Sequence, residues 1–131
     1  MCIFCDIANH TSPADIVYED ENVICFFPIE PEAYGHILVV PKKHHETIFD
    51  ICSEDLLNLM SVIKFLSTKL KLQFGFSGIN ILHASGKDTG QSVFHFHFHI
   101  LPRQENDNIN AWPDLDLVEF DKKGFVKELW K

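Results

Sequence analysis

The sequence has no long hydrophobic run and no surplus of basic residues. None of its apolar stretches approaches the roughly 20 residues that a membrane-spanning helix needs, so we expect no membrane partner. Its 11 Lys+Arg stand against 19 Asp+Glu, a net charge of −8, which argues against binding to nucleic-acid polymers. The first residues contain no basic segment followed by an apolar one, so we expect no signal peptide and a cytoplasmic protein.

Cysteine is also scarce. In a cytoplasmic protein, four cysteines are more typical of free thiols or metal ligands than of structural disulfides. A length of 131 residues, 46% hydrophobic and 23% charged, indicates a single globular domain and excludes a disordered or collagen-like chain. Histidine, by contrast, is abundant, with eight residues at positions 10, 36, 44, 45, 83, 95, 97 and 99.

The hydrophobic pattern predicts several short strands and one long amphipathic helix. Apolar runs bounded by turn residues predict strands at 15–20, 23–27, 36–40, 78–82 and 93–101. Ser53 fits a helix N-cap, and an apolar stripe follows it at helical spacing, formed by Leu56, Leu59, Met60, Ile63, Leu66 and Leu70. The stripe predicts a helix of roughly 18 residues. Residues 2–9 fit a short leading helix, and residues 104–131 form a polar tail without clear periodicity. Because the strands mostly follow one another without a crossover helix, we expect an α+β fold with an antiparallel sheet.

The segment 93–101 alternates strictly between apolar residues and histidine. On a strand, its apolar residues face the core, and these are Phe94, Phe96, Phe98 and Ile100. His95, His97 and His99 line the opposite face, with neighbouring histidines about 6.5–7 Å apart. One interpretation is a solvent-exposed strand face that happens to carry histidine, but such a face needs no particular polar residue and three histidines in a row are not expected there. We therefore favour metal ligation or histidine-centred catalysis, both of which this spacing allows.

A glycine-rich loop, residues 86–92, leads into this segment. Its backbone N–H groups and the Ser92 hydroxyl could hold an anion such as phosphate beside the imidazoles. A phosphate held next to a neutral imidazole is the arrangement required for nucleophilic attack on phosphorus.

Residues 95–101 resemble the signature of the histidine triad (HIT) family, His-φ-His-φ-His-φ-φ with φ apolar, and they match it at every position. Residues 90–92 and 35–44 also resemble the family, so the similarity covers about residues 2–103 of a single domain, 1–131. The resemblance implies a half-barrel of five antiparallel strands with one long and one short helix, pairing into a homodimer through a continuous sheet. It also implies hydrolysis or transfer at the α-phosphate of a nucleotide conjugate, such as a phosphoramidate or a dinucleoside polyphosphate, with no catalytic metal.

The resemblance assigns roles residue by residue. His97 would be the nucleophile that forms a nucleotidyl-histidine intermediate, with His99 and His36 supporting its ring and contacting phosphate. The phosphate-binding loop would be formed by Gly90, Gln91 and Ser92, of which Ser92 could also assist the leaving group.

Two residues depart from the family pattern. Pro28 stands where the family often has an aspartate that holds the ribose hydroxyls, although Glu30 lies nearby. Ala84 stands where many members have asparagine or glutamine. These departures motivate a second hypothesis, a non-catalytic, zinc-stabilised nucleotide-binding or interaction module. A third hypothesis is a metalloenzyme in which His95, His97 and His99 bind one metal.

Cys2 and Cys5 form half of a potential structural zinc site, because such sites have four tetrahedral ligands. Bacterial-type HIT proteins, which this chain resembles, complete the set with two histidines, here His44 and His95. Spacing alone also allows His45 in place of His44. The alternative is a pair of free or redox-active thiols, but we favour zinc because the matching histidines are present and a thioredoxin-type setting is absent.

Ordinary structural roles suffice for the other candidate residues. Cys25 lies in an apolar strand and fits the core, and Cys52 flanks the long helix without a visible partner. His10 and His83 fit surface or hydrogen-bonded polar positions.

Overall fold

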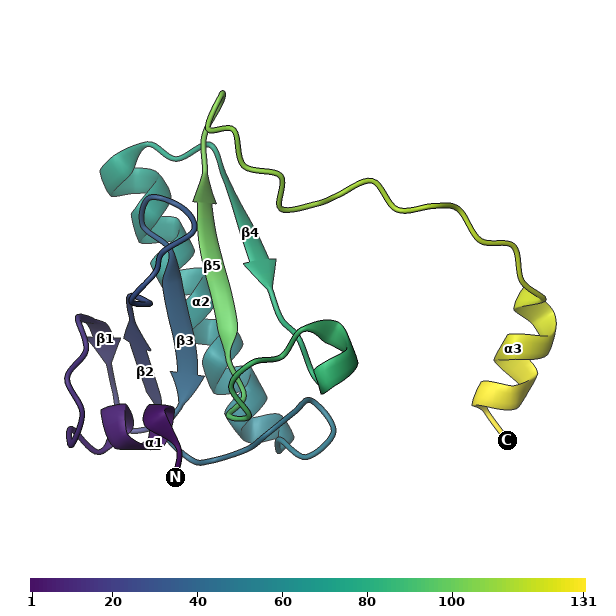
Figure 1. The fold of residues 1–131 in the computed structure, drawn as a ribbon, viewed down its shortest axis with the longest axis horizontal. Helices are drawn as coiled ribbons and strands as arrows, with labels where there is room; N and C mark the ends of the chain where they lie inside the picture. The colour runs from purple at the N-terminus through teal and green to yellow at the C-terminus, as the bar shows by residue number, and fades with distance from the viewer.

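A five-stranded antiparallel sheet with helices on both sides organises the protein, and the computed structural model describes residues 1–131 (Figure 1). Its strands are β1 (Ile16–Glu19), β2 (Val23–Phe26), β3 (Ile37–Pro41), β4 (Gly78–Leu82) and β5 (Phe98–Arg103). They lie in the order β1-β2-β3-β5-β4, and every neighbouring pair is antiparallel. The helices are α1 (Ile3–Ala8), α2 (Ser53–Phe74) and α3 (Lys122–Leu129), with a 3-10 turn, η1, at Lys87–Thr89. The predicted α+β fold is confirmed, whereas α3 was not predicted.

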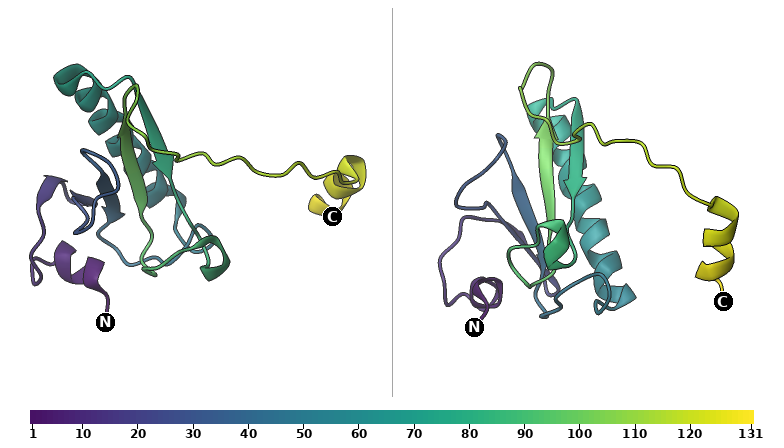
Figure 2. Two further views of the ribbon diagram at one scale, coloured as in Figure 1. Left: turned by 45° about the horizontal axis from the view of Figure 1, so that its top comes forward. Right: turned by 45° about the vertical axis from the view of Figure 1, so that its right-hand side comes forward.

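The central strands β2 and β3 are buried on both faces, because different helices cover the two sides of the sheet (Figure 2). Successive strand residues point to opposite faces. The core on the α2 side includes Val23, Cys25, Ile37 and Val39 together with Leu59, Val62, Ile63, Leu66 and Leu70 of the helix. The core on the α1 side consists of Ile24, Phe26, Leu38, Val40, Phe4, Ile7 and Ala8. The predicted core position of Cys25 is therefore confirmed.

Helix α2 begins and ends differently from the prediction. Its N-cap is Cys52, whose backbone is extended, and Ser53 is already helical, so the predicted Ser53 cap is wrong. The helix continues for 22 residues until Gly75, whose positive φ of 75° lets its N–H bond to the Lys71 carbonyl. Glycine adopts this left-handed conformation without a steric penalty, so it ends the helix. Met60, predicted in the apolar stripe, is 40% exposed and lies outside the core.

The histidine segment forms a strand only from Phe98 onward, not from residue 93 as predicted. Residues 93–97 leave the ladder because Phe96 N–H donates to the carbonyl of His45, in the loop after β3, at 2.6 Å. The alternation of faces nevertheless persists, since Phe96 and Ile100 are fully buried on the α2 side. Phe94 is an exception: it is 43% exposed, so its predicted place in the core is wrong.

The C-terminal tail leaves the sheet and runs across open space to α3 (Figure 1). Residues 104–121 contain neither helix nor strand, and no residue beyond position 102 is buried. Asp121 caps α3 by accepting a hydrogen bond from the N–H of Gly124. None of the helices combines the length and the hydropathy that a bilayer crossing requires.

Candidate catalytic and metal site

The alternation places His95, His97 and His99 on the face opposite Phe96 and Ile100, the side where α1 lies. His95 is fully buried, His97 is 9% exposed and His99 is half-buried. The ring centroids of His97 and His99 lie 5.1 Å apart. Phe4 of α1 makes T-shaped contacts with His95 and His97, at centroid distances of 5.9 and 5.2 Å. Helix α1 therefore forms a wall against two of the three imidazoles.

The hydrogen bond of His97 determines which of its nitrogens carries the proton. Its Nδ1 lies 2.8 Å from the carbonyl oxygen of His95, which can only accept, so Nδ1 is the donor. In the neutral ring Nε2 then has a free lone pair, and no group of the chain bonds to it. Burial lowers the pKa of His97 and so favours the neutral ring. A neutral, oriented imidazole with an available lone pair is suited to nucleophilic attack.

A hydrogen bond between their rings links His36 to His99, a contact that the sequence did not predict. The backbone N–H of Glu32 donates to Nδ1 of His36 at 3.0 Å, so the His36 proton lies on Nε2. This Nε2–H donates to Nδ1 of His99 at 2.9 Å, which leaves the His99 proton on Nε2. Burial lowers the pKa of His36 and lowers that of His99 to about 4. The site thus combines the lone pair of His97 with a hydrogen-bond donor, His99 Nε2–H.

The glycine-rich loop leads into the histidine segment, and its last residues have different surroundings. Gly90 has φ of 91° and ends the η1 turn. Gln91 is buried, and its side-chain amide accepts from Gly86 N–H at 2.7 Å and donates to the Glu46 carbonyl at 2.7 Å. The Gln91 side chain therefore shapes the loop from inside the protein. Ser92 is exposed and lines a hollow that Met1, Cys2, Ile3 and His44 also border.

Cys2, Cys5, His44 and His95 come together in one cluster. His95 Nδ1 lies 3.3 Å from Cys2 Sγ and 3.5 Å from Cys5 Sγ. His44 Nδ1 lies 3.3 Å from Cys5 Sγ and 3.2 Å from His95 Nδ1. Tetrahedral zinc, with Zn–N of about 2.05 Å and Zn–S of about 2.3 Å, separates its ligand atoms by roughly 3.3–3.8 Å. The four side chains therefore fit a zinc ion.

The protonation of the cluster supports the same fit. His95 Nε2–H donates to the carbonyl of Pro41 at 2.7 Å, which orients the Nδ1 lone pair toward the thiols. Burial lowers the pKa of His95 to about 4 and keeps this ring neutral. Burial and the hydrogen bond with Cys2 raise the pKa of Cys5 to about 11, so two neighbouring thiolates are unfavourable without a cation.

The structure separates alternatives that spacing left open. His45 lies outside this cluster, because its Nε2 bonds to Asp55 Oδ2 at 2.7 Å. His95, His97 and His99 do not converge on one metal: the Nδ1 atoms of these three rings face the thiols, a backbone carbonyl and His36 respectively. The triad is thus divided between two adjoining sites.

His83 lies beside His97, a partner that the sequence did not indicate. Its Nδ1–H donates to the backbone carbonyl of His97 at 2.9 Å, and its ring stacks on Phe96 at 4.4 Å. Its Nε2 accepts from the Ser85 hydroxyl, whose oxygen accepts the N–H of Ile48 at 2.8 Å. The prediction of a hydrogen-bonded polar residue is confirmed. No local pattern marks its partner, because His97 lies 14 residues away.

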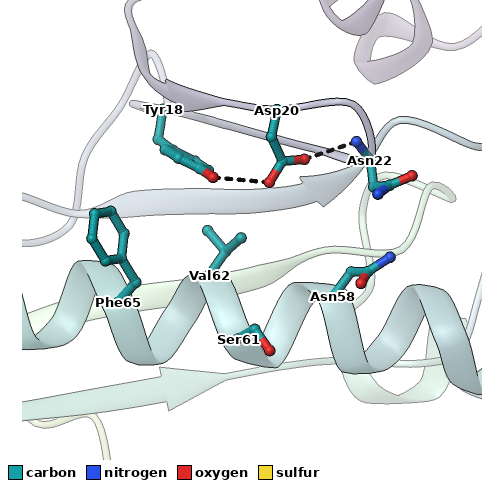
Figure 3. Close-up of a pocket in the computed structure, with 7 residues that line it drawn as sticks. All are labelled: Tyr18, Asp20, Asn22, Asn58, Ser61, Val62 and Phe65. Atoms are coloured by element: carbon teal, nitrogen blue, oxygen red, sulfur yellow. Dashed lines mark hydrogen bonds between the residues drawn. The ribbon is translucent and has the colours of Figure 1, made fainter.

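A second hollow lies between the β1–β2 turn and α2, and no histidine lines it (Figure 3). The Tyr18 hydroxyl donates to Asp20 at 2.9 Å, and Asp20 accepts the N–H of Asn22 at 2.8 Å. The helix side is lined by Asn58, Ser61, Val62 and Phe65. Because the Asp20 carboxylate is engaged in ordering the turn, this hollow offers no free charged group to a ligand.

Comparison with known proteins identifies the family. The HIT domain model matches residues 9–106. A HIT-like protein of Methanocaldococcus jannaschii is 48% identical over 107 residues, 82% of each chain. An adenosine 5′-monophosphoramidase of Saccharomyces cerevisiae is 36% identical over 131 residues, 98% of this chain and 80% of its own. The crystal structure of a zinc-bound histidine triad family protein from Mycobacterium smegmatis matches with a TM-score of 0.80 and 34% identity, covering 88% of this chain and 84% of that one. The chain belongs to the histidine triad (HIT) family.

Proposed function

We propose that the protein is a nucleotide phosphohydrolase or nucleotidyl transferase that cleaves nucleotide conjugates at the α-phosphate, through a covalent intermediate on His97. The observation that carries the proposal is the state of His97: buried, neutral, held through Nδ1, and with Nε2 unpartnered. Family membership and similarity to an adenosine 5′-monophosphoramidase support a phosphoramidate as the first substrate class to test.

The reaction proceeds in two displacements. His97 Nε2 attacks the α-phosphorus, a P–N bond forms to the imidazole, and the bond to the leaving group breaks as that group takes up a proton. Water then attacks the same phosphorus, the P–N bond breaks, and the nucleoside monophosphate leaves with neutral His97 restored. One water is consumed in each turnover, and the nucleotide transfers to an alcohol instead when that alcohol replaces water.

The neighbouring residues stabilise the charge on phosphate. His99 Nε2–H is a donor beside His97, and His36 holds His99 in the tautomer that makes it one. The backbone amides at Gly90, Gln91 and Ser92 bind a phosphate oxygen, and the Ser92 hydroxyl assists the leaving group. The Gln91 side chain, which is engaged inside the protein, acts by shaping the loop.

Cys2, Cys5, His44 and His95 hold a structural zinc ion in this proposal. Their ligand-atom spacing and the unprotonated Nδ1 of His95 support it. When bound, the ion neutralises the two thiolates and crosslinks α1 to the loop after β3 and to the histidine segment.

The test uses adenosine 5′-phosphoramidate with wild-type protein and with His97→Ala. We expect this variant to lose turnover by more than about 10³-fold, because removal of a nucleophile abolishes the covalent route. Wild-type protein mixed rapidly with α-³²P-labelled substrate and quenched in acid-free denaturant should carry label, and the variant should not.

His10→Ala is the matched control, because this exposed histidine pairs only with Glu19. It should keep wild-type turnover and labelling. Substantial turnover by His97→Ala would disprove the nucleophile. Tight nucleotide binding without turnover by wild type, over a panel of conjugates, would favour the non-catalytic binding module.

A further inference from the structure

A second cluster of metal-ligating side chains lies where α2 begins, at the lower end of that helix in Figure 1. His45 comes from the loop after β3, Cys52 is the N-cap residue of α2, and Asp55 lies in its first turn. One ligand atom from each of the three lies within 4.8 Å of the other two. None of these side chains takes part in the catalytic cluster or in the Cys2–Cys5 cluster.

The donor set is chemically mixed and partly enclosed. It offers one imidazole nitrogen, one thiol sulfur and one carboxylate oxygen, a set that suits zinc or cobalt rather than calcium or magnesium. The side chains of His45 and Asp55 are 16% and 12% exposed, whereas Cys52 is exposed. His45 and Asp55 are therefore held in place by the surrounding protein, whereas Cys52 lies on the side of the cluster that faces solvent.

We propose that His45, Cys52 and Asp55 bind a second divalent transition-metal ion with an open fourth position. Three protein ligands and one position open to water or a small ligand is the coordination typical of accessible zinc sites.

Binding requires only a small local change. The 2.7 Å separation of His45 Nε2 and Asp55 Oδ2 is that of a hydrogen bond. A tetrahedral ion would widen it to about 3.3 Å. The Cys52 thiol releases its proton to solvent, and the Nε2 proton that His45 shares with Asp55 is displaced, so that the neutral ring carries its single proton on Nδ1 while Nε2 becomes a ligand.

The second cluster should bind metal more weakly than the first. It has three ligands where the first has four, and the charge of Lys43 also acts on Asp55 and opposes a cation. The simplest competing explanation is that the His45–Asp55 ion pair only ties the loop to α2. In that case Cys52 would have no part in metal binding.

The test counts Co²⁺ bound per chain by equilibrium dialysis and elemental analysis, with absorption spectra to detect thiolate ligands. We expect Cys52→Ser to bind one ion fewer than wild type. We expect Cys2→Ser/Cys5→Ser to retain a thiolate-to-cobalt absorption band that disappears when Cys52→Ser is added.

Two first-turn variants of α2 provide the matched comparison. Asp55→Asn should lose one ion, whereas Glu54→Gln, which removes an exposed charge outside the cluster, should lose none. An equal ion count in wild type and Cys52→Ser would overturn the proposal. This comparison does not need Cys2→Ser/Cys5→Ser, so it remains decisive even when that variant does not fold. Because the readout is a metal count, it is independent of the proposed hydrolase activity.

Discussion

Backbone groups determine the tautomers of the three buried histidines. His97 donates to the carbonyl of His95, His95 donates to the carbonyl of Pro41, and His36 accepts from the N–H of Glu32. Since these backbone groups do not titrate, each tautomer is maintained for as long as the local fold persists. One nitrogen of each ring is thereby held by the backbone, while the other faces the Cys2 thiol in His95, bonds to His99 in His36, and has no hydrogen-bond partner in His97.

The buried imidazoles make stability depend on pH. The pKa of His99 is about 4 in the folded protein, against an ordinary value of 6.5. Between these values the unfolded chain binds a proton that the folded chain does not, so the free energy of unfolding is greatest above pH 6.5 and falls as the pH drops to about 4. Urea unfolding at pH 7.5, 6, 5 and 4, roughly spanning that window, measures this dependence.

His99→Asn should reduce the slope between these pH values, because the group that titrates is gone while an acceptor for His36 remains. Gln73→Ala, at an exposed position of α2 with no titratable group, is the control and should leave the slope as in wild type. A wild-type slope in His99→Asn would contradict the assignment.

At the scale of elements, α1 contacts both the cluster of Cys2, Cys5, His44 and His95 and the neighbouring His97. It is only six residues long, too short to be stable as an isolated helix. The Phe4 ring packs against His97 and Phe26. In the sequence, Phe4 lies between Cys2 and Cys5. A metal bound by these cysteines would therefore hold Phe4 in place against His97.

Removal of the metal should loosen α1 before the rest of the fold. After chelation we expect amide hydrogen exchange over residues 3–8 to accelerate about tenfold or more, since loss of roughly 1.4 kcal/mol of local stability has this effect. Amides of α2 between Leu59 and Leu70 should exchange as before, because their core lies on the other side of the sheet. Equal protection of residues 3–8 with and without metal would contradict the crosslinking role.

At the scale of the whole molecule, both edges of the sheet and the C-terminal tail are open. β1 and β4 each have an unpaired edge, and the tail carries exposed large apolar residues such as Trp112, Leu117 and Trp130. Exposed edges and apolar side chains are typical of surfaces that contact other chains. The family resemblance implies a homodimer through a continuous sheet, and we predict that it forms by pairing of the β4 edges of two copies.

The two edges allow a direct test of the dimer. Ile81 on β4 and Ile16 on β1 are similarly exposed, at 45% and 43%. Ile81→Asp should shift the protein toward monomer in sedimentation equilibrium, because a buried carboxylate opposes pairing at that edge. Ile16→Asp is the control and should leave the mass distribution unchanged. A dimer that is insensitive to Ile81→Asp would exclude the β4 edge as the interface.

The sequence by itself determined the features that act over a few residues. Period-2 and helical patterns located all five strands and α2, and alternation placed His95, His97 and His99 on the face opposite Phe96, because side-chain direction follows local backbone geometry. Family resemblance brought Cys2, Cys5, His44 and His95 into one set.

Only the tertiary structure decided between His44 and His45 as a member of the cysteine cluster. It also left the Phe94 side chain exposed, and it shortened the histidine strand because the Phe96 N–H bonds to the His45 carbonyl. It also determined the tautomer of His97 and brought His83 beneath it. These outcomes depend on contacts between segments up to 93 residues apart, such as Cys2 and His95, and no local pattern encodes such contacts.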